Sequence, residues 1–117
     1  MNVEYEVIEG HIVFRPYSEL ELLNIHELTG AIQKAAAGAK SKRMLIDASN
    51  VPFVDSTALG ALVIEARKLS EDGGYIHFFG ARPGLIESLY ITKLERMLKP
   101  FKTLEEALAF EPMVAAE

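Results

Sequence analysis

The chain has 117 residues, of which half are hydrophobic and a quarter are charged, and it contains no cysteine. This length and balance predict one folded domain over residues 1–117 and argue against a disordered or low-complexity chain. The missing cysteine excludes disulfides, thiol catalysis and cysteine-ligated metal sites. The formal net charge is −5, and residues 1–30 hold six acids and one base. Because phosphate binding needs a basic surface, we expect no nucleic-acid partner.

The sequence offers no segment suited to a membrane. The core of its most apolar stretch, 56–64, is bounded by Asp55 and Glu65, whereas a spanning helix needs about 20 mostly apolar residues. The first residues are acidic and lack the basic start and apolar run of a signal peptide. We therefore expect a cytoplasmic protein with no membrane partner.

The first predicted elements are two strands that form a hairpin. Apolar and acidic side chains alternate over Val3–Ile8, which is the period of a half-buried strand. Glu9-Gly10 has the composition of a tight turn, and His11–Arg15 is a second β-rich run. The hairpin Val3–Arg15 is therefore expected at an edge of the sheet.

A first helix is predicted between Ser18 and Gly38. Ser18 is a suitable N-cap, and Glu19 and Glu21 would lie in the first turn, where acids favour the helix dipole. Gly38 is a typical stop. The apolar residues at helical spacing are Leu20, Leu23, Leu28, Ile32, Ala35 and Ala36.

The rest of the chain alternates between predicted strands and helices. The strands are 43–48 and 75–80; the helices start at Asp55 or Ser56, near Pro83 and after Thr103; residues 94–98 remain unassigned. Such alternation favours parallel pairing with right-handed crossovers. We predict an α/β domain with a four- to five-stranded mixed sheet, the hairpin at one edge, and helices mainly on one face.

No motif for catalysis or cofactor binding stands out. His11, His26 and His77 lack metal-ligand spacing, and no glycine-rich phosphate loop or nucleophile elbow is present. We therefore expect no metal site and no cofactor. Asp47 at a strand end and Asp55 eight residues later could support acid–base or magnesium chemistry. The alternative is that Asp47 anchors the loop and Asp55 caps a helix.

The sharpest local feature is Asp55-Ser56-Thr57 at the predicted start of a helix. Any one of these three side chains could be the cap. The free N–H groups of a helix start also suit an attached phosphate. Small residues follow, so that another protein could approach the hydroxyl closely. Capping and phosphorylation both remain open from the pattern alone.

Residues 44–62 read MLIDASNVPFVDSTALGAL, and this stretch resembles the signature of the STAS domain. An apolar strand ends in aspartate, a loop carries a phenylalanine, and Asp-Ser-Thr opens a helix that contains Leu-Gly. Residues 91–96 and 101–108 resemble later segments of the family. Lys93 and Ala58 stand where the family often has glycine, and 15–21 differs from the family's turn after the second strand.

The resemblance implies a function for the serine after Asp55. In anti-sigma factor antagonists of this family that serine, here Ser56, is phosphorylated; Thr57 is the alternative site. The resemblance implies that the dephosphorylated protein binds an anti-sigma factor that is also its serine kinase, and so releases a sigma factor. A serine phosphatase resets the switch, and the domain itself is no enzyme. A non-switching STAS adaptor or scaffold subunit, with Ser56 only a cap, is the second hypothesis.

The partner is expected on the face around Ser56. The flanking small residues suggest an open surface, and two apolar residues of the preceding loop could be its anchors. The predicted partner-binding residues are Phe53, Val54, Asp55, Ser56, Thr57, Ala58 and Gly60; the structural anchors of the site are Asp47 and Asp55.

Overall fold

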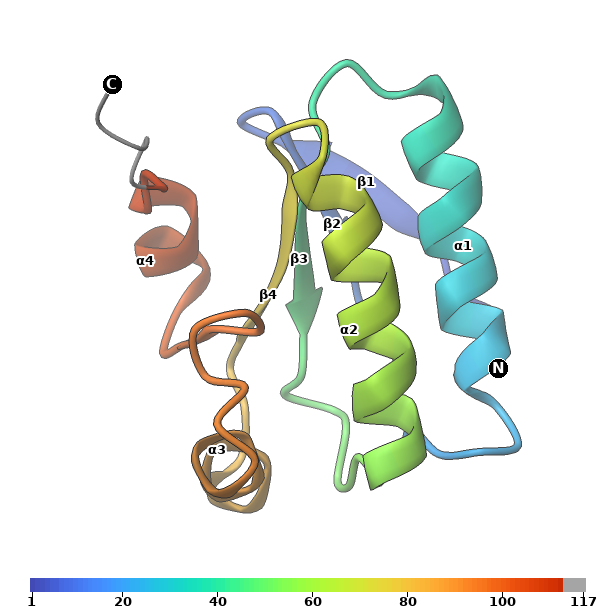
Figure 1. The fold of residues 1–117 in the computed structure, drawn as a ribbon, viewed down its shortest axis with the longest axis vertical. Coiled ribbons are helices and arrows are strands. Elements are labelled where there is room, and N and C mark those ends of the chain that lie inside the picture. The colour runs from blue at the N-terminus through green and yellow to red at the C-terminus, as the bar shows by residue number, and fades with distance from the viewer. Residues whose placement is uncertain (113–117) are drawn as a thin grey trace.

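The computed structural model describes residues 1–112 and contains a five-stranded mixed sheet (Figure 1). The strands lie in the order β1-β2-β3-β4-β5; β1 is antiparallel to β2, and the other neighbours are parallel. The elements are β1 Tyr5–Ile8, β2 His11–Phe14, α1 Ile25–Gly38, β3 Arg43–Asp47, α2 Ser56–Ser70, β4 Tyr75–Phe79, α3 Pro83–Ile91, β5 Pro100–Phe101 and α4 Leu104–Ala109.

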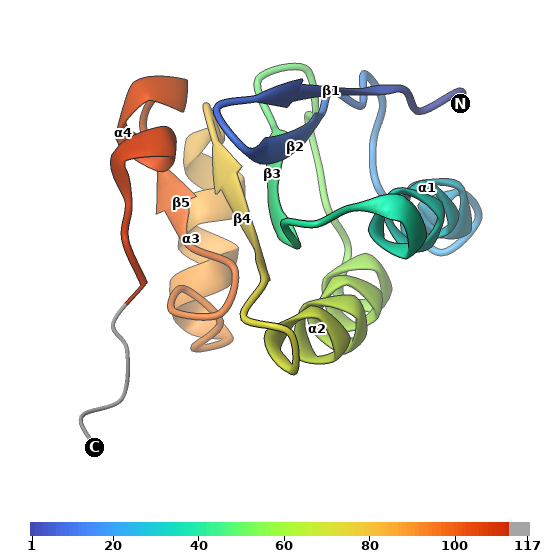
Figure 2. The ribbon, with the colours of Figure 1, turned by 90° about the horizontal axis from the view of Figure 1, so that it is seen from above.

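Helices cover the two faces of the sheet unequally (Figure 2). The larger core joins α1, α2 and α3 to alternate strand residues, among them Phe14, Met44, Ile46 and Phe78. The side chains between these, such as Leu45, face the other side, where α4 packs. This alternation follows from the period of two along each strand. The predicted fold class is thereby confirmed, including the hairpin edge and the helices mainly on one face.

The start of α1 differs from the prediction. The helix begins at Ile25, and Leu20 instead forms an isolated parallel bridge with Val54. The Asn24 side chain holds the intervening turn, because its Oδ1 accepts from the Glu21 N–H at 2.9 Å. Leu23 was predicted on the buried face of a helix, but it is 77% exposed. The predicted cap at Ser18 is therefore wrong, because a long-range bridge competes with local helical periodicity here.

The strand β5 was not predicted, and it spans only two residues. Its neighbourhood is held to β4 through backbone bonds, including Phe78 N–H to the Lys99 carbonyl at 2.8 Å and Gly80 N–H to the Phe101 carbonyl at 3.2 Å. A strand of two residues is too short to show a period-2 pattern, so the sequence gives no sign of it. Its first residue is a proline, which is tolerated because β5 lies at the edge of the sheet.

Replacing Lys93 with glycine is expected to stabilise the fold by about 0.5–1 kcal/mol. Lys93 follows the end of α3 and has φ 61°, in the left-handed region that a side chain disfavours. Its side chain is exposed, so little packing is lost. Urea unfolding of Lys93→Gly measures the effect. In contrast, Lys68→Gly on the exposed face of α2 should destabilise the fold by about 1 kcal/mol. Equal losses of stability in both variants would contradict the strain inferred at Lys93.

Candidate functional site

The loop that follows β3 is held by the Asp47 carboxylate. Its Oδ1 accepts from the Ser49 backbone N–H at 3.0 Å and from the Ser49 hydroxyl at 2.6 Å. Its Oδ2 lies 3.4 Å from Nε of Arg15. Gly80 lies next to this turn and has a φ of 70°. A Cβ atom added at Gly80 would be in ordinary van der Waals contact with Ser49. Asp47 thus fixes the first turn of a loop, and its oxygens are already engaged.

Asp55 connects the start of α2 to the segment before α1. Its Oδ1 accepts from the Ala58 N–H at 2.8 Å, which makes Asp55 the N-cap of α2. Its Oδ2 accepts from the Leu22 N–H at 3.1 Å. The bridge between Leu20 and Val54 lies alongside, with Asp55 N–H donating to the Leu20 carbonyl at 3.0 Å. One carboxylate therefore fixes both segments.

Ser56 and Thr57 are exposed in the first turn of α2. Because Asp55 supplies the cap, the cap bond to the Ala58 N–H needs neither hydroxyl. Of the three side chains that could have capped the helix, the structure selects the acid. The two hydroxyls therefore face solvent at a helix start, where the backbone dipole favours negative charge.

Exposed apolar side chains gather around this helix start. Phe53 is 57% exposed, Leu22 is 64% exposed and Leu23 is 77% exposed. The Leu20–Val54 bridge and the bond from Leu22 to Asp55 place the segment that carries Leu22 and Leu23 beside the start of α2. Sequence reasoning missed these two leucines, because Leu23 fits the buried stripe of a helix and Leu22 falls within the same predicted helix. No local signal distinguishes that stripe from a turn held by distant contacts.

Two of the predicted partner-binding residues are buried. Ala58 has no exposed surface and Val54 is only 5% exposed; both pack into the core. The prediction that they meet a partner is wrong, because the Leu20–Val54 bridge covers Val54 and α2 turns Ala58 inward. We call the remaining exposed set the α2-start surface; it consists of Leu22, Leu23, Phe53, Ser56, Thr57 and Gly60.

The carboxylates of Asp47 and Asp55 each hold backbone N–H groups. Asp47 accepts from Ser49, and Asp55 accepts from Ala58 and Leu22. Over residues 1–112, no group of three or more histidine, aspartate or glutamate side chains is placed to hold a metal ion. Nor does any helix in this part of the chain combine the length and the apolarity needed to cross a membrane.

The sequence and the fold of this chain are similar to those of known proteins. Residues 2–107 match the sequence model of the STAS domain. A candidate anti-sigma factor antagonist of Thermotoga neapolitana is 27% identical over 89% of this chain and 92% of its own length. An anti-sigma factor antagonist of Mycobacterium paratuberculosis is 26% identical, with TM-score 0.77 over 92% of this chain and 90% of that one. The phosphorylated form of the Bacillus cell fate determinant SpoIIAA is 21% identical, with TM-score 0.68 over 91% of this chain and 96% of that one.

Proposed function

This chain belongs to the STAS domain family, and we propose that it is an anti-sigma factor antagonist controlled by phosphorylation of Ser56. Without phosphate, the α2-start surface binds an anti-sigma factor that is also the serine kinase, and a sigma factor is released. Transfer of phosphate from ATP to Ser56 ends that binding, and a serine phosphatase restores it. The domain takes part as substrate and ligand and catalyses no step itself. The switch acts in the cytoplasm, where sigma factors meet RNA polymerase.

The observation that carries this proposal is the exposed Ser56 hydroxyl beside a cap that Asp55 already provides. A serine needed as the cap would have its oxygen engaged with the helix backbone, and phosphorylation would disturb the helix start. Here the hydroxyl can be modified while the cap stays in place. The relatives named as anti-sigma factor antagonists support the partner class, and the phosphorylated SpoIIAA structure supports the type of control.

The phosphorylation site can be tested with ATP and the histidine-kinase-like ATPase encoded nearest to this gene. We expect one phosphate on the wild-type chain, located on Ser56 by mass spectrometry of peptides. Ser56→Ala should remain unmodified, whereas Thr57→Ala should be modified as the wild type is. Phosphate on another residue would contradict the site. Tight binding without any phosphate transfer would instead support the non-switching adaptor.

Phe53→Ala is expected to weaken binding of the same kinase by about tenfold or more. Phe53 is the aromatic side chain of the α2-start surface, and such apolar anchors carry most of the energy of an interface. Isothermal titration measures the effect. Val7→Ala is the matched control, because Val7 is 66% exposed on β1, near the hairpin turn at the other end of the sheet (Figure 1). A loss with Val7→Ala and none with Phe53→Ala would place the partner elsewhere.

A further inference from the structure

The outer edge of β1 is a row of unpaired backbone groups. Among the described residues, β1 pairs with β2 alone and no strand lies beyond it. The two-residue turn Glu9-Gly10 has φ 46° and 77°, as in a type I′ hairpin, and Ile8 faces His11 directly before it. The pairs bonded to β2 are therefore Ile8 with His11 and Glu6 with Val13. It follows that the N–H and carbonyl groups of Tyr5 and Val7 point outward.

One face of this edge is apolar. Tyr5 is 51% exposed and Val7 is 66% exposed, and both lie on the face that α1 covers. They border a groove of about 360 Å³ between β1 and the end of α1, whose lining includes Ile12, Ala35 and Ala39 together with Lys34 and Lys40. A strand added to the edge would place every second side chain over this groove.

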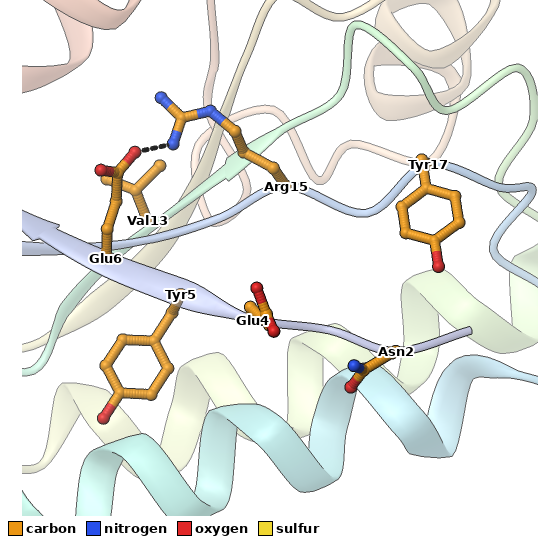
Figure 3. A pocket seen from close by; sticks show the side chains of 7 residues that line it. All are labelled: Asn2, Glu4, Tyr5, Glu6, Val13, Arg15 and Tyr17. Carbon is orange, nitrogen blue, oxygen red and sulfur yellow. Dashed lines mark hydrogen bonds and ion pairs between the residues drawn. The ribbon is translucent and has the colours of Figure 1, made fainter.

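The opposite face of the same edge is acidic. Glu4 and Glu6 flank a pocket of about 480 Å³, together with Arg15 and Tyr17 (Figure 3). Arg15 is the one base in residues 1–30, and it is paired with Glu6 and also lies near Asp47. Figure 3 shows Arg15 turned toward Glu6, with Glu4 just before the start of β1 and away from this pair. Glu4 thus adds a negative charge that no base of this segment balances.

We propose that the β1 edge binds an extended segment of another protein in which basic and apolar side chains alternate. The segment would add a sixth strand, with backbone bonds to Tyr5 and Val7, apolar side chains over the groove and basic ones beside Glu4 and Glu6. A second copy of this chain fits poorly when its β1 strand pairs about Tyr5. Antiparallel pairing of two β1 strands about Tyr5 would set Glu4 against Glu6 of the other copy, and like charges opposite one another are destabilising.

The probe is a peptide of about ten residues with alternating lysine and valine, and its binding is measured by fluorescence anisotropy. A peptide of this length can add one strand to the sheet edge. We expect Val7→Pro to weaken binding by about tenfold, because it removes one outward N–H while leaving the bonds to β2. Glu4→Lys should weaken binding severalfold and reduce its dependence on salt. A peptide with the same composition in two blocks, and one with glutamate in place of lysine, should bind far more weakly.

Hydrogen exchange separates strand addition from simple charge attraction. The alternating peptide should protect the Tyr5 and Val7 amides, which are unbonded in the free chain. Circular dichroism checks that Val7→Pro is folded. Unchanged binding by folded Val7→Pro, or binding without new amide protection, would overturn the proposal. So would a dimer in sedimentation that Val7→Pro abolishes, because a second copy would then be the occupant. Phe53→Ala should bind this peptide normally, so failure here is distinct from failure of the Ser56 switch.

Discussion

Ser56→Asp is expected to bind the anti-sigma factor kinase at least about 30-fold more weakly than the wild-type chain, while its unfolding free energy changes little. A phosphate adds about −1.5 to −2 charges at neutral pH, and aspartate supplies part of that charge. Within the free domain the charge is tolerated, because the start of α2 offers unbonded N–H groups and a favourable dipole worth about 0.3–1 kcal/mol.

The neighbouring Asp55 opposes this gain by repulsion, but its oxygens already accept bonds from Ala58 and Leu22, which disperse its charge. The domain should therefore keep its shape. The interface should not tolerate the charge, because it must be desolvated among Leu22, Leu23 and Phe53, which offer no hydrogen bonds. The proposed switch is thus a local electrostatic and steric block that needs no rearrangement of the fold.

Binding and unfolding must be measured on the same variants to test this mechanism. Ser56→Ala should bind the kinase as the wild type does and should resist phosphorylation. Ser70→Asp is the matched control, because Ser70 is an exposed serine at the opposite end of α2 and should leave binding intact. If Ser56→Asp bound as tightly as wild type, or lost binding only because it unfolded, the block would be excluded.

Local patterns were sufficient for most of the fold and for the centre of the site. The strand that ends at Asp47 and the cap at Asp55 follow from side chains within a few residues of one another, and the structure has both. The errors lie where distant segments compete with local preference. Leu20 pairs with Val54, which moves the start of α1 and exposes Leu23. The same bridge buries Val54. The motif around Asp55 therefore did not indicate which of its residues lie at the surface.

His77 shows a property that no sequence pattern indicated, since a lone histidine in an apolar strand gives no sign of its neighbours. It lies on β4 and is 4% exposed. Its ring stacks on Tyr75 at 4.4 Å, and Phe101 and Phe110 meet it edge-on. Nδ1 accepts from the Lys99 backbone N–H at 2.9 Å, which requires that this nitrogen carry no proton.

The domain is expected to lose about 3 kcal/mol of stability through His77 alone as the pH falls from 7 to below 4. Burial, and to a smaller extent the charge of Lys99, lowers the pKa of His77 from 6.5 to about 4. Between these values the unfolded chain binds a proton that the folded chain does not, so the stabilisation is complete above pH 6.5 and is lost as the pH falls toward 4. Other ionisable side chains lie close to His77. Tyr75 shares a hydrogen bond of 3.1 Å with His11, and Arg43 lies near the Tyr75 ring.

Urea unfolding at pH 7 and pH 4.5 isolates this contribution when the wild type is compared with two variants. His77→Asn keeps an acceptor for the Lys99 N–H but does not titrate, so it should reduce the difference between the two pH values by about 2 kcal/mol. His26→Asn changes an exposed histidine on α1 and should leave that difference as it is in the wild type. The absolute stability of His77→Asn at pH 7 should fall, because the stacked ring is lost. An unchanged pH difference in His77→Asn would mean that the buried ring can accept a proton without cost, and that its surroundings do not hold it neutral.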